Sequence, residues 1–576
     1  MLRKLLITAL VAGFAAAPAQ AARTLLMPGV TYERQVQFTS QGPVAIHVLL
    51  APKPGGLYSL KPVLSNGAIV GLERVTAMQR AVTGATTAGV NGDLFREDGL
   101  PSGVLLQSGA LARSPSPDRS SIGIGADGSL QVERVKVFAT WRGSGQRRAL
   151  LLNLPPGPNG VSLFTSAWGP TTPAGSGATE AVLPLYPPAT PNIDLTGTVG
   201  EIRQGGGTPI PPGGAVVVAR GTGATRLTAE APVGGPFVAR LLLNPDWKGI
   251  VDAIGGGPAL VRAGKPVFRH FEFFSTDQLA RNPRTAVGQL ADGRIILVVV
   301  DGRQPGYSVG MTNFDLAQAL VRLGAVTASG LDGGGSSTMA FDGTLLNRPS
   351  DPAGERAVSE GLFVLYGGVY APPPTEPVLS PNGDGVAETQ TLAYELVRPA
   401  RVTATLTGPD RVPRPLETAD KPAGVYPLTW TGLKPDGTPE PEGTWRFSVS
   451  AIDDAAQPSL AERLFVVDRT LAALTATPAL VRVGPAGERL RARFTVTRLA
   501  NIRVTIETRA GAVSALVART TLAPGTHTIE WDGRAAAGFA GAGSYVVRVA
   551  AQTEIGASSL TAPLTLRRAV ARQSRR

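Results

Sequence analysis

The stretch Leu331-Asp-Gly-Gly-Gly-Ser-Ser-Thr-Met339 places three consecutive glycines between two apolar runs, 325–331 and 338–341. Three glycines in a row cost backbone entropy and make no side-chain contacts, so a sheet gains no stability from them. They do allow the main chain to approach another group closely. Their N–H groups, beside the hydroxyls that follow, can form a concave donor surface suited to an anion such as phosphate. A glycine-rich hairpin loop explains the stretch equally well.

A strand, a helix and a second strand lead into these glycines. The runs Ile295–Val300 and Ala325–Leu331 are predicted to be buried strands, and a capping box opening at Thr312 predicts a helix between them. This order is typical of a β-α-β crossover with parallel strands. Asp301 and Asp332 would then lie at the same edge of the sheet, where ligand crevices form.

Length and composition predict several domains. A chain of 576 residues is too long for one core, and the absence of cysteine means that its folds rely on packing alone. From Thr24 to about Tyr370 the sequence is rich in apolar runs cut by Gly, Pro and Asp-Gly turns. We therefore expect an α+β fold for residues 22–370, a β-rich mixed-sheet catalytic domain with few helices.

Residues 1–21 have the pattern of a signal peptide. Arg3 and Lys4 precede an apolar run from Leu5 to Ala17, and Ala19-Gln20-Ala21 supplies a small-residue cleavage site. No later segment is apolar for long enough to span a bilayer as a helix. The protein is therefore expected to be exported and to be extracellular, periplasmic or associated with the cell surface.

The charge of the chain is basic. The formal net charge is +12, and the predicted basic tail, residues 567–576, contains five arginines. Basic charge suits anionic envelope polymers as partners, and it also suits nucleic acid. Aromatic residues make up only 6% of the chain and no nucleic-acid motif is present, so we do not expect nucleic acid as a partner.

A proline-rich stretch, residues 371–377, reads as a stiff linker and a domain boundary. The segments 378–468 and 469–566 then share a weak repeat, in which a tryptophan (Trp430, Trp531) ends one alternating strand and a second alternating strand follows. This pattern predicts two all-β sandwich modules, each with a Trp-bearing hairpin. Both segments resemble the Ig-like repeat of flagellar hook-assembly-type proteins, which implies a spacer role.

Oxygen ligands cluster at the opening of the first of these segments. Asn382, Asp384 and Glu388 stand close together around two glycines. The spacing is too short for an EF-hand loop, but it leaves a weak calcium candidate. A plain turn explains the same residues, and we predict no other metal or cofactor.

Several kinds of catalytic site are disfavoured. The chain has no cysteine, its three histidines are scattered without ligand spacing, and no lysine follows the glycines as in a nucleotide-binding P-loop. Catalysis would therefore rely on carboxylates, with arginines and backbone amides stabilising charge. Arginines stand beside carboxylates at several predicted strand ends, which fits a site for a phosphate joined to a sugar. Surface ion pairs of little energetic weight are the alternative.

Six short blocks stand out in residues 24–369: Asn91-Gly-Asp-Leu-Phe95, Ile254-Gly-Gly-Gly-Pro258, Arg284-Thr-Ala-Val-Gly288, Val300-Asp-Gly-Arg303, Leu331-Asp-Gly-Gly-Gly-Ser-Ser337 and Asn347-Arg-Pro-Ser350. Together they resemble the phosphodiester glycosidase family, which includes the lysosomal uncovering enzyme. The common form of the first block in that family is Asn-Gly-Gly-Phe/Tyr-Phe, and this chain departs from it at Asp93 and Leu94.

The resemblance implies cleavage of the bond between the anomeric carbon of a sugar and a phosphodiester oxygen. The expected function is thus an exported glycosidase acting on glycosyl-1-phosphodiesters, α-N-acetylglucosaminyl or similar, in envelope polysaccharide or glycolipid. A non-catalytic protein that binds phosphoglycans or the cell wall is the alternative. A hydrolase acting on the phosphate side of another phosphodiester is a third option.

The expected site follows from this resemblance and from the residue types. Asp332, Asp301 and Asp93 are the catalytic candidates, the last either an acid in the site or a turn residue. Because no base is evident beside them, the serines of the glycine stretch are expected to donate hydrogen bonds rather than act as nucleophiles. The predicted substrate- and phosphate-binding residues are Asn91, Arg284, Thr285, Arg303, Gly333, Gly334, Gly335, Ser336, Ser337 and Arg348.

Overall fold

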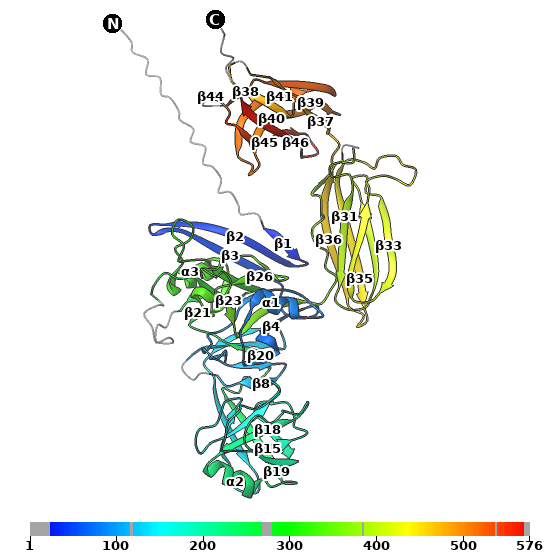
Figure 1. Cartoon of the computed structure of the whole chain (residues 1–576). Helices are drawn as coiled ribbons and strands as arrows, with labels where there is room; N and C mark the ends of the chain where they lie inside the picture. The colour runs from blue at the N-terminus through cyan, green and yellow to red at the C-terminus, as the bar shows by residue number, and fades with distance from the viewer. Residues whose placement is uncertain are drawn as a thin grey trace, which may run out of the picture. The chain divides into compact units, whose positions relative to one another are not determined.

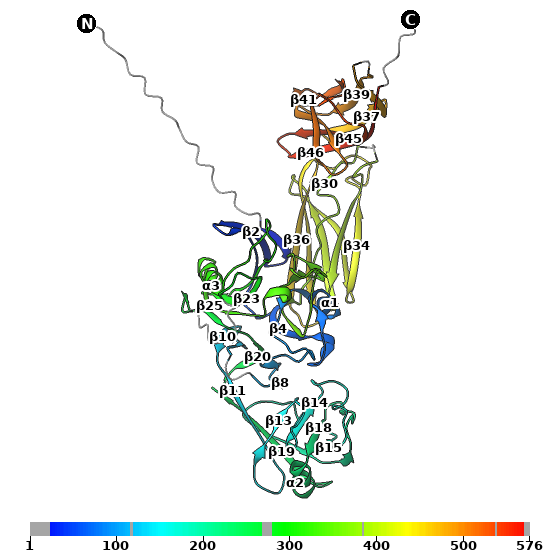
Figure 2. The same cartoon turned by 60° about the vertical axis from the view of Figure 1, so that its left-hand side comes forward.

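The structure, a computed structural model, describes residues 23–115, 119–267, 279–382, 385–485, 487–535 and 538–569. The predicted signal peptide lies outside these residues, and so does most of the predicted basic tail, whose first two arginines end a strand. The chain divides into two compact units, Met1–Gly367 and Gly368–Arg576 (Figures 1 and 2). No helix within the described ranges is long and apolar enough to cross a membrane.

Strands predominate in both units, which confirms the predicted β-rich fold with few helices. The α-helices of the described residues are α1 (Val75–Ala81), α2 (Thr222–Glu230) and α3 (Asn313–Arg322), all in the first unit. The largest sheet has the order β1 (Thr24–Met27), β2 (Val30–Thr39), β3 (Gly42–Ala51), β24 (Ile295–Val300), β23 (Arg284–Leu290), β25 (Ala325–Gly330), β21 (Ala259–Arg262), β22 (Lys265–Pro266).

Two smaller sheets and one strand pair adjoin it in the first unit. The second sheet is β27 (Thr344–Leu345), β26 (Met339–Phe341), β6 (Thr86–Asn91), β29 (Glu360–Tyr366), β4 (Tyr58–Leu64). The third is β10 (Leu130–Glu133), β9 (Ser121–Gly125), β20 (Ile250–Gly255), β7 (Leu105–Gln107), β8 (Ala110–Arg113). A short pair joins β28 (Ala357–Val358) to β5 (Glu73–Arg74).

The segment between β10 and β20 adds two sheets and α2. Its core contains Trp141 and Phe237, whose rings stack with centroids 5.5 Å apart. One sheet is β12 (Arg148–Ala149), β11 (Lys136–Arg142), β19 (Pro236–Asn244), β16 (Asp194–Thr198). The other is β13 (Leu151–Leu152), β14 (Val161–Thr165), β18 (Ala215–Arg220), β15 (Ala178–Leu183), β17 (Glu201–Gln204).

The predicted strand–helix–strand crossover is present as β24, α3 and β25. Strand β23 lies between the two strands and is antiparallel to both, so β24 and β25 run parallel to each other. The Thr312 side chain caps α3 by accepting a hydrogen bond from the Asp315 N–H at 3.0 Å, and Leu316 and Leu320 pack into the core beneath the sheet. Asp301 and Asp332 therefore leave the sheet at the same edge.

The second unit consists of two β modules, each with its own buried core. The strands of the first are β30 (Val378–Leu379), β31 (Gln390–Leu396), β32 (Ala400–Thr407), β33 (Pro413–Lys421), β34 (Gly424–Trp430), β35 (Gly443–Asp453), β36 (Pro458–Val467). Those of the second are β37 (Leu471–Thr477), β38 (Leu480–Val483), β39 (Leu490–Val496), β40 (Ala500–Thr508), β41 (Val513–Leu522), β42 (Gly525–Trp531), β43 (Arg534–Ala535), β44 (Gly538–Phe539), β45 (Gly543–Gln552), β46 (Ala557–Arg568).

The sequence predicted that the Trp-bearing repeat forms a hairpin, and this prediction is wrong. Strand β34 pairs with β31, whereas β35 pairs with β32 and β36 in the facing sheet, and β42 and β45 are separated in the same way. Trp430 and Trp445 project into one core from the two sheets, with ring centroids 4.6 Å apart. Alternation shows that each strand has a buried face, but it does not show which strand is its partner.

The proline-rich stretch 371–377 belongs to the second unit. The units divide at Gly367–Gly368, and Ala371 is buried in the core of the first β module. Thr375 and Glu376 both hydrogen-bond the side chain of Gln390. The proline-rich stretch is therefore attached to the first β module and does not form a free linker.

Candidate active site at the glycine turn

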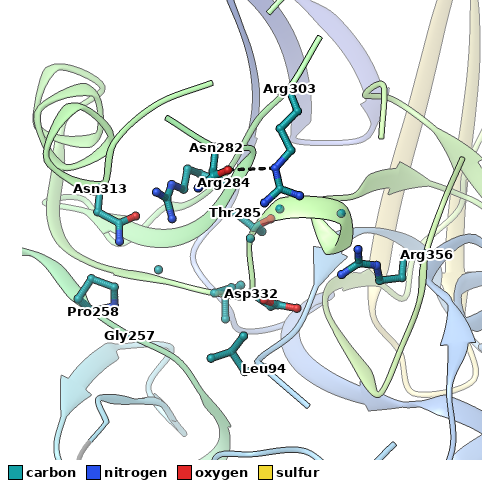
Figure 3. A pocket seen from close by; sticks show the side chains of 15 residues that line it. Leu94, Gly257, Pro258, Asn282, Arg284, Thr285, Arg303, Asn313, Asp332 and Arg356 are labelled. Atoms are coloured by element: carbon teal, nitrogen blue, oxygen red, sulfur yellow. Dashed lines mark hydrogen bonds between the residues drawn. The ribbon is translucent and has the colours of Figure 1, made fainter. Parts of the chain in front are cut away.

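A cavity of about 250 Å³ opens at the edge of the large sheet where β25 ends (Figure 3). It lies beside the glycine stretch of the sequence, which forms a tight turn at Gly334–Ser336. Its lining residues come from seven separate parts of the chain: Leu94, Gly257, Pro258, Asn282, Arg284, Thr285, Arg303, Asn313, Gly330, Leu331, Asp332, Gly333, Gly334, Gly335 and Arg356.

Three arginines line this cavity together with one carboxylate, that of Asp332. The Arg284 Nε donates to the Met311 carbonyl at 3.0 Å, and the Arg303 Nε donates to the Asn282 Oδ1 at 3.0 Å. Arg356 is oriented by two hydrogen bonds to Asp351, which lies outside the lining. In the view of Figure 3 the Arg303 guanidinium lies between the other two. Such a set of charges favours an anionic ligand.

The glycine stretch does not form the row of free amides that its sequence suggested, and this part of the prediction is wrong. The Gly334 N–H donates to the Pro283 carbonyl, and the Ser336 and Ser337 N–H groups donate back into the turn. The Thr338 N–H donates to the Asn91 side chain. Because these N–H groups already have acceptors within the fold, the guanidinium groups are the charged donors of the cavity lining.

The glycines instead make room for the arginines. Gly334 has a φ of +63°, which few other residues adopt, and a Cβ there would lie 3.2 Å from a guanidinium nitrogen of Arg303. A Cβ on Gly335 would lie 2.1 Å from both the Arg356 Nη2 and the Asp351 Oδ1. The main chain therefore does approach other groups closely, as predicted, but these groups are side chains of the protein itself rather than a ligand.

Asp332 supplies the carboxylate of the cavity lining. Burial raises its pKa to about 6, and the charge of Asp93 acts in the same direction. A hydrogen bond from Ser336 and the charge of Arg356 oppose that shift. A carboxylate with a pKa near 6 in a cavity changes its protonation close to neutral pH, as general acid–base catalysis requires.

The side chain of Asn91 holds the strand ends together instead of facing a ligand. It is fully buried at the end of β6, and its Nδ2 donates to the Asp332 carbonyl at 2.9 Å. Its Oδ1 accepts from the Thr285 hydroxyl at 2.8 Å and from the Thr338 N–H at 3.1 Å. Thr285 lines the cavity, but its hydroxyl is directed to Asn91. The prediction of Asn91 as a substrate ligand is corrected accordingly.

Asp93 lies in a buried cluster behind Asp332, outside the cavity lining. It accepts two hydrogen bonds from the Arg119 guanidinium, one of them at 3.0 Å. Its N–H donates to the Glu360 carboxyl at 3.4 Å, and burial together with the charge of Asp93 raises the pKa of Glu360 to about 8. Asp93 is therefore neither a turn residue nor a group that touches the cavity; its charge acts on Asp332 through space.

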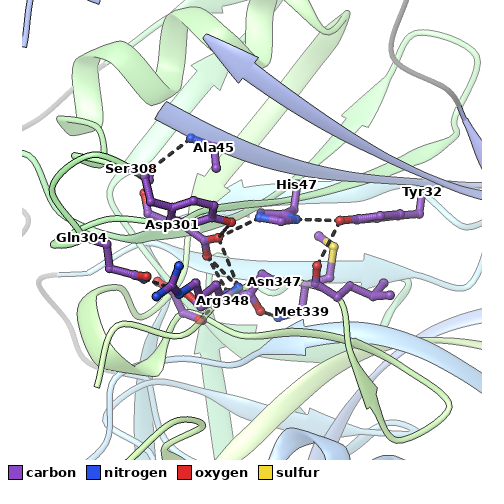
Figure 4. Close-up of polar contacts among 12 residues, drawn as sticks. Tyr32, Ala45, His47, Asp301, Gln304, Ser308, Met339, Asn347 and Arg348 are labelled. Carbon is purple, nitrogen blue, oxygen red and sulfur yellow. Dashed lines mark hydrogen bonds and ion pairs between the residues drawn. The ribbon is translucent and has the colours of Figure 1, made fainter. Parts of the chain in front are cut away.

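Asp301 does not line the cavity either, although it leaves the sheet at the same edge. Figure 4 shows its contacts with His47 and Asn347. Asp301 is buried and accepts from the His47 Nε2, the Tyr307 hydroxyl and the Asn347 Nδ2, each at 2.9 Å. Burial opposes its ionisation, but these hydrogen bonds and the charge of His47 bring its pKa below the ordinary value. Asp301 is thus an anchor for the surrounding loops, and its predicted catalytic role is corrected.

The remaining predicted ligands also lie outside the cavity lining. Arg348 is exposed, and its guanidinium lies 5.0 Å from the centre of the Tyr307 ring. Ser336 and Ser337 are buried beneath the turn. The structure therefore brings Asp332, Arg284, Thr285, Arg303 and the three glycines together, and it leaves the other predicted residues around them.

Sequence reasoning missed several lining residues. Asn282 lies two residues before Arg284, so its position was an available signal. Arg356 was visible as an arginine following a carboxylate, but no local pattern connects it to the cavity. Asn313 opens α3, and Pro258 and Leu94 supply apolar surface. These residues are far apart in the chain, so only the fold assembles them.

The calcium candidate is only partly visible. Asp384 lies outside the described residues, and the Glu388 carboxylate accepts the Gly385 N–H at 3.1 Å. The Asn382 side-chain amide donates to the Ser380 hydroxyl at 3.2 Å. Within the described ranges, no group of three or more His, Cys, Asp or Glu residues is arranged to hold a metal ion.

Part of the first unit is similar to a known family of domains. Residues 192–365 match the family model described as "Phosphodiester glycosidase", and every lining residue of the cavity except Leu94 lies within this range. The predicted resemblance is therefore confirmed for this part of the chain.

Curated relatives match parts of the chain. An uncharacterized SPbeta prophage-derived protein of Bacillus subtilis is 36% identical over 21% of this chain and 18% of its own length. The basal-body rod modification protein FlgD of Salmonella typhimurium is 30% identical over 26% of this chain and 60% of its own length. The N-acetylglucosamine-1-phosphodiester alpha-N-acetylglucosaminidase of Bos taurus is 40% identical over 12% of each. The chain thus spans less than two thirds of each relative.

Solved structures also align with the chain. A hypothetical protein from Synechocystis is 25% identical, with a TM-score of 0.49 over 61% of this chain and 64% of that chain. The catalytic domain of the zebrafish N-acetylglucosamine-1-phosphodiester alpha-N-acetylglucosaminidase is 18% identical, with a TM-score of 0.32 over 60% of this chain and 86% of that chain.

Proposed function

We propose that the first unit is an exported glycosidase that hydrolyses glycosyl-1-phosphodiesters, with α-N-acetylglucosaminyl or a similar sugar. The observation that carries this proposal is the convergence of Arg284, Arg303 and Arg356 on one cavity beside Asp332. The match to the phosphodiester glycosidase family supports it. Envelope polysaccharide or glycolipid is the proposed source of the substrate, with the two β modules as spacers.

The proposed chemistry divides the work between the arginines and the carboxylate. A phosphate monoester, whose second pKa is about 6, leaves a sugar far more readily than an alcohol does. Protonation of the leaving group then matters less than neutralising its charge, which the three guanidinium groups would do. The Asp332 carboxylate would activate a water molecule or stabilise the oxocarbenium-like carbon.

The Asp332→Asn variant tests this assignment. An amide of the same shape keeps the packing but can neither take up a proton nor carry a negative charge. We expect sugar release from an α-sugar-1-phosphodiester to fall by a factor of about 10² or more, the usual contribution of a general base. Circular dichroism and thermal unfolding of the variant should match those of the parent protein.

Three results would reject the proposal. Near-normal turnover of the Asn variant would remove Asp332 from the reaction. Binding of the substrate without turnover by the parent protein would favour a phosphoglycan-binding role. Incorporation of oxygen from labelled water into the phosphate rather than the sugar would indicate a different phosphodiesterase.

A further inference from the structure

Outside the cavity, the guanidinium groups of two arginines lie close to one tyrosine ring on the surface of the first unit. The Arg34 guanidinium, on β2, lies 5.5 Å from the centre of the Tyr307 ring, and the Arg348 guanidinium lies 5.0 Å from it. Both arginines are exposed, and the ring is half-buried. We call these three residues the Tyr307 platform.

Hydrogen bonds hold the Tyr307 hydroxyl and the main chain of Arg348 in place, and Figure 4 labels Asp301, Gln304 and Arg348, which take part in them. The Tyr307 hydroxyl donates to the Asp301 carboxylate at 2.9 Å, and the Arg348 N–H donates to the same carboxylate at 3.2 Å. The Arg348 carbonyl accepts from the Gln304 Nε2 at 3.0 Å. Because these bonds fix the Tyr307 hydroxyl and the main chain of Arg348, only the arginine side chains have to be ordered when a ligand binds.

The charges of the platform are not matched by acids. Among the described residues, no carboxylate forms an ion pair with the guanidinium of Arg34 or of Arg348. The one buried acid nearby, Asp301, is already occupied by His47, Asn347 and Tyr307. The two guanidinium groups both lie close to the Tyr307 ring and repel each other, and an anion bound near both would relieve that repulsion.

The platform adjoins the rim of the cavity. Arg303 lines the cavity, and the next residue, Gln304, contacts Arg348. A cavity of about 250 Å³ accommodates one sugar with its phosphate and little more. The group on the other side of that phosphate, the aglycone, then has to leave the cavity past its rim.

We propose that the Tyr307 platform binds the aglycone of the substrate, with Arg34 and Arg348 pairing with a second phosphate on that aglycone. This inference rests on the proposed function and narrows its substrate class to glycosyl phosphodiesters with a further phosphate beyond the scissile one. A nucleoside diphosphate sugar and a polymer of glycosyl phosphates both carry such a group.

The first experiment compares substrates with the same sugar. The kcat/KM is measured for a methyl phosphodiester of α-N-acetylglucosamine, for UDP-N-acetylglucosamine and for a short oligomer of glycosyl phosphates. We expect the parent protein to prefer one or both of the last two over the methyl compound by about tenfold or more, the size of a charge-assisted contact. Which of the two is preferred identifies the source of the second phosphate.

Variants of the platform supply the decisive comparison. Arg34→Ala with Arg348→Ala should reduce the preference for phosphorylated aglycones by about tenfold, whereas Arg294→Ala, at an exposed arginine paired with Asp292, should leave it as it is. A preference that survives the double change, or one that Arg294→Ala removes equally, would overturn the proposal.

A binding measurement separates this inference from the proposed function. Calorimetric titration of the Asp332→Asn variant with UDP-N-acetylglucosamine and with the oligomer needs no turnover. If the Arg34 and Arg348 changes raise the Kd for either ligand about tenfold in that background, the platform binds phosphate even where hydrolysis is absent. If neither Kd rises, the platform is not a phosphate site, whatever the activity of the parent protein.

Discussion

The pKa of Asp332 depends in part on Asp93, a charged group that lies outside the cavity lining. Behind it, the Arg119 guanidinium donates to the Asp93 carboxylate, and Glu360 is buried without contact to solvent. The carboxyl groups of Asp93 and Glu360 lie beside one guanidinium, so the cluster would carry an excess of negative charge if both were ionised. Burial makes such a charge costly unless one of the two keeps its proton. The pKa of Glu360, about 8, identifies it as the group that keeps the proton, so Asp93 is the charge that acts on Asp332.

This arrangement predicts a pH dependence. Asp332 must be ionised to activate water, so kcat/KM should rise as the pH rises through about 6. Asp93→Asn removes a negative charge that disfavours ionisation of Asp332, and the midpoint should therefore move to lower pH. Glu360→Gln should leave the midpoint in place, because Glu360 is already uncharged at pH 6. A midpoint that stays fixed in Asp93→Asn, or that moves equally in both variants, would contradict the assignment.

At the scale of elements, the site depends on how tightly a turn can approach arginine side chains. The turn after β25 passes between Arg303 and Arg356, and the bare main chain of Gly335 lies against the ion pair of Arg356 with Asp351. The parallel course of β24 and β25 supplies the sheet edge, but β23, which lies between them, supplies Arg284 and Thr285. The turn after β25 contributes five lining residues, from Leu331 to Gly335, whereas β24 contributes none.

Gly335→Ala tests the turn. Its φ is not in the left-handed region, so the backbone tolerates alanine, but the new Cβ would displace the end of the Arg356 side chain. We expect kcat/KM to fall by about tenfold, since one charged donor to the phosphate is misplaced. Gly157→Ala, at a glycine with open space around it, should change neither activity nor stability. Unchanged kinetics in Gly335→Ala would show that Arg356 does not act on the substrate.

At the scale of the whole molecule, the cavity and the β modules belong to different units of the chain. Every lining residue lies in the first unit, and each module of the second unit has its own core. The β modules therefore contribute none of the residues that line the cavity. Spacing or attachment is the role left to them in the proposed function.

A chain ending at Gly367 tests this separation. We expect it to fold and to hydrolyse a small soluble glycosyl phosphodiester with a kcat/KM within about twofold of the full-length value, because separate domains fold as units. Thermal unfolding and steady-state kinetics of the two forms are the measurements. A folded but inactive short form would show that the second unit contributes to the site.

Much of the fold could be predicted because local patterns encode it. The capping box at Thr312 begins α3, unbroken apolar runs become β24 and β25, and the Trp repeat marks the two β modules. Strand pairing could not be predicted in the same way, since β34 and β35 follow each other in the chain but lie in different sheets. Alternation records one buried face and carries no information about the neighbouring strand.

The sequence by itself determined the residue types of the site: a carboxylate, several arginines, and a glycine turn at the end of a strand. Only the tertiary structure decided which of them meet, since Asp301 and Asp332 leave the same sheet edge but one is satisfied by His47 and the other faces the cavity. The physical reason is that burial and hydrogen bonding depend on distant partners. Asn91 fixes the main chain of Asp332 across 241 residues of sequence, and no local pattern records that contact.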